Sequence, residues 1–279
     1  MSDLRKELQR GSFVTAPIFE VRDVTYSYHE VTALDGLNLT IEPGQRVALL
    51  GANGSGKSTL LSILDGLYFP QKGSVTFCGE PLTEDRLQTQ EVEFNFRRRV
   101  ALVFQNPDVQ LFNPTVFDEV AFGPLQMHWP REKILHRVSE MLEQMEITHL
   151  KNRSPHHLST GEKKRVALAS VLILDPEVLL LDEPTAALDP RSESQMIDFL
   201  VSCSGGRKTV VTATHDLDLI EDIADYCHVF QRGQVVGAGT PAEILNNHDL
   251  LLSTNLIHAH RHAHSGELHS HPHRHGHGH

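Results

Sequence analysis

The residues best suited to chemistry lie between Gly51 and Thr59, in the run Gly-Ala-Asn-Gly-Ser-Gly-Lys-Ser-Thr. Its glycines allow backbone N–H groups to turn inward and form a nest for an anion. A helix expected from about Ser58 to Leu64 would add the positive end of its dipole. Lys57 can reach the outer phosphates of a nucleotide, and the Ser58 hydroxyl can ligate Mg²⁺. This spacing is that of the P-loop, so the sequence predicts a bound nucleoside triphosphate.

The segments on either side of this run support the same interpretation. Residues 46–50 are apolar enough for a short buried strand, and residues 60–64 have a helical pattern. A chance glycine-rich turn is the alternative, and a strand before and a helix after disfavour it. The residues predicted to contact the nucleotide here are Gly51, Asn53, Gly54, Ser55, Gly56, Lys57, Ser58 and Thr59.

A second candidate site, which is acidic, is expected where the apolar run from Val178 to Leu181 meets Asp182 and Glu183. A buried strand that ends in Asp182 can carry this carboxylate to the Mg²⁺ beside a P-loop. Glu183 is then placed to orient or deprotonate an attacking water. The alternative is a core strand followed by an ordinary acidic turn, which the P-loop makes less attractive.

The run Leu-Ser-Thr-Gly-Glu at 158–162 is expected to begin a helix. Ser159 and Glu162 have the spacing of a capping box, so an ordinary helix N-terminus is one interpretation. The exposed N–H groups of the same turn could also bind a phosphate, and Gly161 would allow a close approach.

Composition narrows the class of protein. The chain has 279 residues with 25 Lys and Arg against 36 Asp and Glu, a net charge of −11. This balance disfavours general nucleic-acid binding, which needs a basic face. Cys78, Cys203 and Cys227 are far apart, as in a reduced cytosolic protein. With no apolar run of about 20 residues, we expect a soluble chain whose membrane partner supplies any span.

The hydrophobic pattern predicts a parallel-sheet α/β core with a helical insertion at about 107–174. Strands are expected at 18–21, 24–26, 37–41, 74–77, 99–104, 177–181 and 209–213. Helices are expected at 118–122, 131–145, 162–174, 192–202 and 217–224.

The segment after about Leu256 differs in kind, because it holds ten of the 19 histidines separated by small or polar residues. No packed core is expected there, so 256–279 is interpreted as a flexible tail. Imidazole is a ligand of Ni²⁺, Co²⁺, Zn²⁺ and Cu²⁺. A purification tag and a passive low-complexity tail are the alternatives. The candidate ligands are His258, His260, His262, His264, His269, His271, His273, His275, His277 and His279.

Together these motifs resemble the ATP-binding subunit of an ABC transporter, with the domain at about 18–250. The remaining matches are Gln105 after a strand, the acidic end of LLLDEP at 179–184, Ala-Leu-Asp at 187–189, and His215 after a strand. The resemblance implies a RecA-like P-loop NTPase core with an antiparallel β subdomain and an inserted α-helical subdomain.

The same resemblance implies roles for individual residues. Tyr28 would stack on adenine, and Ser58, Gln105 and Asp182 would surround Mg²⁺. Glu183 would be the general base, with His215 and Lys57 at the γ-phosphate. Ser159, Gly161 and the D-loop residue Asp189 would close over the ATP of a second copy, or of a paralogue, in a head-to-tail dimer.

The signature departs from the family's usual LSGGQ at Thr160 and Glu162. Thr160 adds a side chain beside the nucleotide, and Glu162 brings an acid near a polyphosphate unless its carboxylate folds back onto the cap. We expect a working site that is slower than usual; a degenerate, inactive site is the alternative.

Residues 104–112 resemble the corresponding segment of energy-coupling factor importers. That resemblance implies two membrane partners, a transmembrane coupling subunit and a substrate-binding subunit, and a peripheral position on the cytoplasmic face of the cell membrane. Val109, Leu111 and Phe112 would help to form a groove for a coupling helix, or would belong to the helical core. With the histidine tail, the cobalt and nickel branch is the first hypothesis. A vitamin importer, a soluble ABC protein and a metal-storage protein are the alternatives.

Overall fold

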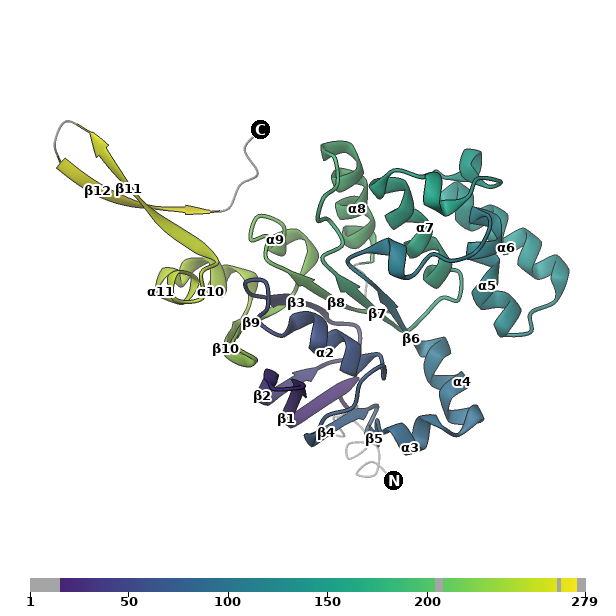
Figure 1. Ribbon diagram of the computed structural model, residues 1–279, viewed down its shortest axis with the longest axis horizontal. Helices are drawn as coiled ribbons and strands as arrows, with labels where there is room; N and C mark the ends of the chain where they lie inside the picture. The colour runs from purple at the N-terminus through teal and green to yellow at the C-terminus, as the bar shows by residue number, and fades with distance from the viewer. Residues whose placement is uncertain (1–15, 204–207, 265–266, 275–279) are drawn as a thin grey trace, which may run out of the picture.

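The computed structural model describes residues 16–203, 208–264 and 267–274, and it places most strands in two sheets (Figure 1). The first sheet is antiparallel, in the order β2-β1-β4-β5. Its strands are β1 (Phe19–Tyr28), β2 (Val31–Ile41), β4 (Lys72–Phe77) and β5 (Glu80–Pro81). The predicted strands 18–21 and 24–26 are one strand, because the register shifts between Val21 and Val24 without ending the pairing.

The second sheet has the order β10-β9-β3-β8-β7-β6. Neighbours among β9, β3, β8, β7 and β6 are parallel, and only β10 runs antiparallel to its neighbour. The strands are β3 (Arg46–Leu50), β6 (Val100–Val103), β7 (Val178–Asp182), β8 (Thr209–Thr214), β9 (Tyr226–Gln231) and β10 (Gln234–Gly239). The predicted parallel α/β core is confirmed.

Helices enclose this sheet. The predicted insertion is confirmed as α5 (Val116–Gln126), α6 (Arg131–Gln144) and α7 (Thr160–Leu172), followed later by α8 (Pro190–Ser202). The helix expected at 217–224 is shorter, with α9 restricted to Ile220–Ile223. The other helices are α2 (Lys57–Leu64), α3 (Glu84–Leu87), α4 (Gln90–Arg99), α10 (Pro241–Asn246), α11 (His248–Ser253), η1 (Pro107–Val109), η2 (Thr148–Leu150) and η3 (Pro155–His157). No helix in the described part of the chain is both long and apolar enough to cross a bilayer.

Each strand of the parallel sheet contributes to two cores. Val47 and Leu49 of β3 pack with α2 and the antiparallel sheet, whereas Ala48 and Leu50 pack with the helical insertion. Successive side chains on a strand point to opposite faces, so a strand covered on both faces must be apolar throughout. This explains why the motif-bearing strands read as uninterrupted apolar runs.

The strand order sets the position of the motifs. Within the parallel sheet β8 lies between β3 and β7, and β6 follows β7. Because these strands are parallel, their carboxyl ends meet at one edge of the sheet, where ligands bind in folds of this kind. The P-loop, His215 and Gln105 follow these ends, and Asp182 is the last residue of β7.

Beyond α11 the backbone forms a separate two-stranded antiparallel sheet, β11 (Ile257–His264) and β12 (Glu267–Arg274). Figure 1 shows this hairpin extending away from the two larger sheets. The sequence predicts a flexible tail for this segment, whereas the structure describes its backbone as a paired hairpin. The division of the chain at about residue 256 stays a prediction.

Candidate nucleotide-hydrolysis site

The P-loop connects β3 to α2 in a conformation that needs glycine. Gly56 has φ +111°, and a Cβ there would lie 2.6 Å from the carbonyl oxygen of Ala33. A Cβ at Gly51 would lie 2.6 Å from the carbonyl oxygen of Phe230. The loop is therefore packed against β2 and β9, and its backbone is fixed before any ligand arrives. Such a fixed loop at a helix N-terminus is suited to binding phosphate.

Lys57 is buried at the start of α2, and its ammonium group faces the loop and the acidic end of β7. Its Nζ donates to the carbonyl oxygens of Gly51 at 2.6 Å and Ala52 at 3.3 Å, and lies 3.8 Å from Glu183 Oε1. Burial lowers the pKa of Lys57, while attraction to Glu183 and Asp182 opposes that shift. A cation held here among neutral carbonyls can exchange those contacts for phosphate oxygens.

Glu183 and His215 meet at the ends of β7 and β8. His215 Nδ1 lies 3.0 Å from both carboxylate oxygens of Glu183. The Glu183 N–H donates to the carbonyl oxygen of Ala213 at 2.9 Å, although Glu183 has φ +46°, a conformation uncommon outside glycine. Lys57, Glu183 and His215 are thus brought together from three strand ends, and the carboxylate has a fixed direction.

Asp182 is buried beside this group. Burial raises its pKa, and a hydrogen bond from the Ser58 side chain lowers it. Its Oδ1 is buried without a hydrogen-bond partner in the described chain, and the same is true of Ser55 Oγ in the P-loop. Buried polar atoms normally have partners, so these two indicate where a ligand completes the site.

The donor set fits Mg²⁺ with a triphosphate. No group of three or more His, Cys, Asp or Glu side chains that could hold a metal gathers in the described residues. Mg²⁺ does not require one, because it is usually held by one or two carboxylates together with substrate phosphates and water. The Asp182 carboxylate and the Ser58 hydroxyl supply oxygen ligands of this kind. Gln105 is exposed two residues beyond β6 at the same edge of the sheet.

Tyr28 ends β1 beside the first turn of α2. Its hydroxyl lies 3.3 Å from Thr59 Oγ1, and its ring makes edge contacts with Tyr26 and Tyr68 at centroid distances of 5.1 and 5.7 Å. The residue is 40% exposed beside the P-loop. The position suits a residue that stacks on a nucleotide base.

The signature residues lie elsewhere, at the N-terminus of α7, and the D-loop residue Asp189 lies at the N-terminus of α8. The predicted capping box is confirmed: Glu162 N–H donates to Ser159 Oγ, and Ser159 N–H donates to Glu162 Oε2 at 2.8 Å. That backbone bond lowers the pKa of Glu162. Glu162 is one of the two residues that differ from the usual LSGGQ signature, and its carboxylate is therefore folded onto the cap.

Gly161 and Asp189 adjoin at this same place. A Cβ at Gly161 would lie 2.6 Å from Ser192 Oγ, and that hydroxyl donates to Asp189 Oδ2 at 2.7 Å. Asp189 also accepts the N–H groups of Arg191 and Ser192 as the cap of α8. Within the chain, these residues contact the starts of α7 and α8 rather than the P-loop.

Lys164 was missed by the sequence analysis. It is buried on α7, and its Nζ donates to the carbonyl oxygens of Glu183, Pro184 and Ala186. Burial lowers the pKa of Lys164 to about 8. The signal that could have found it is its spacing, because Gly161, Lys164 and Leu168 share one buried helical stripe.

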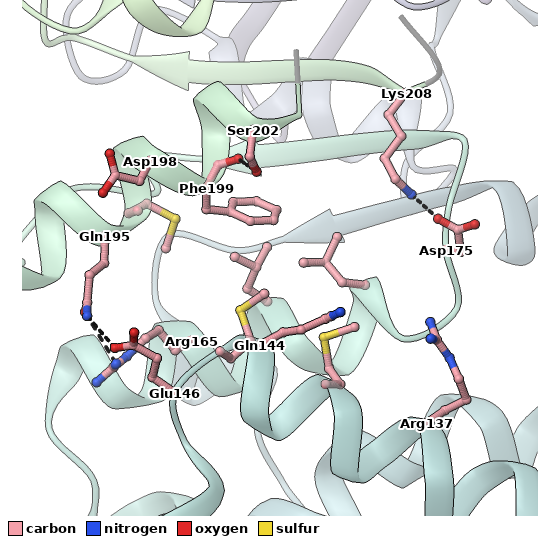
Figure 2. Close-up of a pocket in the computed structure, with 15 residues that line it drawn as sticks. Arg137, Gln144, Glu146, Arg165, Asp175, Gln195, Asp198, Phe199, Ser202 and Lys208 are labelled. Carbon is pink, nitrogen blue, oxygen red and sulfur yellow. Dashed lines mark hydrogen bonds and ion pairs between the residues drawn. The ribbon is translucent and has the colours of Figure 1, made fainter. Parts of the chain in front are cut away.

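A cavity of about 550 Å³ lies apart from these motifs, between α6, α7 and α8 (Figure 2). Its lining includes Met141, Met145 and Met196, with Arg137 and Lys208 among the charged residues. None of the residues predicted to hold the nucleotide lines it. This cavity is therefore not the candidate site.

Comparison with known proteins agrees with the geometry. The family described as "ABC transporter" matches residues 34–186. The chain belongs to the ABC transporter family. As an ABC ATPase, it is 54% identical to the nickel import ATP-binding protein NikO of Rhodobacter capsulatus, over 86% of this chain and 96% of that one. It is 44% identical to the energy-coupling factor transporter ATP-binding protein EcfA of Methanoculleus marisnigri, over 86% and 85%.

A solved structure gives the same result for the fold. The chain superposes on cbiO1 of Clostridium perfringens, described as part of the ABC transporter complex cbiONQ, with a TM-score of 0.72 and 37% identity. The match covers 86% of this chain and 95% of that one. The predicted ABC ATPase fold is therefore confirmed.

Proposed function

We propose that this ABC ATPase hydrolyses ATP to ADP and phosphate to power uptake of nickel or cobalt through an energy-coupling factor importer. The observation that carries the catalytic part is the meeting of Lys57, Glu183 and His215 at one sheet edge. The transport part is supported by the nickel import relative and by the cbiO1 structure.

In the proposed reaction, Glu183 accepts a proton from the attacking water while His215 holds its carboxylate and faces the γ-phosphate. Lys57 exchanges its carbonyl contacts for the β- and γ-phosphates. Ser58, Gln105 and Asp182 would hold Mg²⁺, which neutralises charge on those phosphates when bound. Because little covalent chemistry is required of the protein in phosphoryl transfer, fixed positions and fixed charges do most of the work.

A second copy, or a paralogue, completes the proposed site. Ser159 and Gly161 present a capped helix N-terminus at α7, beside Asp189. In a head-to-tail pair this turn would cover the nucleotide held by the partner's P-loop. Because Glu162 is engaged by the cap, its charge is turned toward the backbone rather than left free to repel the phosphates.

A coupling subunit is the proposed membrane partner. A groove of about 250 Å³ between the parallel sheet and the helical insertion is lined by Phe112, Phe122 and Leu174, among others. Phe112 is 61% exposed and makes an edge contact with Phe122 at 5.0 Å between centroids. Buried Glu119 accepts the N–H groups of Phe112 and Asn113, which fixes this segment. An apolar helix from the membrane subunit would dock here, placing the chain on the cytoplasmic membrane face.

The tail is proposed to bind cargo metal locally rather than to select it. The register of β11 and β12 sets His258 opposite His273, His260 opposite His271, and His262 opposite His269. Directly opposed positions on an antiparallel pair are neighbouring positions of the sheet, so the backbone register brings these histidine positions together in pairs. His275, His277 and His279 lie outside the described residues. Deleting residues 258–279 should reduce Ni²⁺ and Co²⁺ binding in calorimetry and leave ATP turnover unchanged.

Metal uptake by the assembled importer tests this function. The chain would be co-expressed with its membrane subunits, and cell-associated radioactive nickel and cobalt would be counted beside a matched Lys57→Ala complex. We expect uptake of one of the two metals with the parent chain and background uptake with Lys57→Ala. Vitamin uptake without metal uptake would support the vitamin branch instead. Equal metal uptake by both complexes would refute the proposal.

A further inference from the structure

The buried ammonium group of Lys164 connects the signature helix to the loop that carries the proposed base. Lys164 lies on α7, three residues after Gly161, and is 3% exposed. Its Nζ donates to three carbonyl oxygens, those of Glu183 at 2.9 Å, Pro184 at 3.1 Å and Ala186 at 2.7 Å. A lysine has three N–H donors, so each one has a partner in this loop.

The loop held in this way has an unusual backbone. Glu183 has φ +46° and Ala187 has φ +58°, both in the left-handed region that residues other than glycine rarely adopt. Such conformations persist only where the surrounding structure over-determines them. The N–H groups of Glu183 and Ala186 are bonded to the carbonyls of Ala213 and Glu183, and Lys164 secures the carbonyl side of the same loop.

We infer that Lys164 is a positioning residue for hydrolysis, which fixes the Glu183 backbone so that its carboxylate points at the attacking water. This inference rests on the proposed role of Glu183 as the base. Lys164 acts through the loop, because its donors are engaged by carbonyl oxygens and not by the carboxylate. Removing it would take the ammonium donor away from three carbonyl oxygens, of which that of Glu183 keeps the Ala186 N–H, and would allow the loop to leave its left-handed conformation.

The expected effect is on turnover rather than on nucleotide binding. Lys164→Met keeps the length of the side chain and removes all three donors. Since a misplacement of about 1 Å can lower a rate by about 100-fold, we expect kcat to fall by about 10- to 100-fold. KM and the affinity for a fluorescent ATP analogue should stay within about twofold, because the P-loop is untouched. Lys164→Gln, which keeps amide donors, should recover part of kcat.

A double-mutant cycle separates positioning from general damage. If Lys164 acts only through Glu183, Lys164→Met should lower single-turnover hydrolysis no further in a Glu183→Gln background. Lys163→Met is the matched control. Lys163 immediately precedes Lys164 on α7, and its ammonium group pairs with Asp108 at 2.7 Å instead of with the loop. It should keep the parent kcat.

Three results would overturn the inference. The first is that Lys164→Met keeps the parental kcat. The second is that Lys164→Met lowers single-turnover hydrolysis in the Glu183→Gln background by the same factor as in the parent. The third is that Lys164→Met loses affinity for the ATP analogue together with kcat. If Lys164→Met does not fold, as judged by its melting temperature, Lys164→Gln takes its place in the cycle. Parental turnover in Glu183→Gln alone would instead show that the proposed base is wrong, which distinguishes the two failures.

Discussion

Buried His228 should make the stability of the fold depend on pH. This residue lies on β9, opposite Leu49 of β3, and is 6% exposed. Neither ring nitrogen has a hydrogen-bond partner in the described chain. Burial lowers its pKa from 6.5 to about 4, so the folded protein holds the ring neutral where the unfolded chain would protonate it.

The sign and size follow from the difference between the two pKa values. Because the folded pKa is the lower one, the stabilisation is present above about pH 6.5 and is lost as pH falls toward 4. The full loss is about 3 kcal/mol, and about 2 kcal/mol of it is reached at about pH 5. His228→Phe keeps a ring of similar size and removes the proton site.

Urea unfolding followed by circular dichroism at about pH 7.5 and about pH 5 measures this effect. The free energy of unfolding of the parent should fall by about 2 kcal/mol more than that of His228→Phe over this interval. Equal losses in the parent and in His228→Phe would refute the reasoning.

Three further predictions concern the nucleotide site and the docking groove. Lys57→Ala should weaken binding of a fluorescent ATP analogue by at least about 10-fold, as expected for loss of a charged contact; unchanged binding would contradict the assigned role. Gly56→Ala should lower the melting temperature and ATP affinity more than Gly54→Ala, because a Cβ at Gly56 meets the Ala33 carbonyl at 2.6 Å, whereas nothing lies within 4 Å of one at Gly54. Equal effects would show that the loop relaxes freely. Phe112→Asp should abolish co-purification with the membrane subunits and preserve ATPase activity of the isolated chain; retained co-purification would place the docking surface elsewhere.

Much of the candidate site is predictable because its motifs are local. The spacing of Gly51, Gly56 and Lys57 is determined by the geometry of one loop and one helix N-terminus. The capping box of Ser159 and Glu162 is likewise contained in one helical turn, and the structure confirms it. The alternation of apolar runs with helical patterns also predicts a parallel sheet, and the structure confirms this core.

Other features depend on tertiary contacts that the sequence does not display. Helix α5 continues to Gln126 through Gly123 and Pro124, although a proline removes a backbone hydrogen bond and favours an end. The left-handed conformation of Glu183 and the burial of Lys164 arise from packing between segments 19 residues apart. No rule of local propensity predicts a buried lysine that donates to three carbonyls.

The central claim is that Glu183 is the base of an ATPase whose nucleotide is held independently by the P-loop. Steady-state ATP turnover by Glu183→Gln, beside ATP retention and dimerisation measured by gel filtration, tests it most directly. We predict that turnover falls by about 100- to 10,000-fold, as expected for loss of a general base, while ATP stays bound in a closed dimer. Turnover at the parent rate would contradict the account.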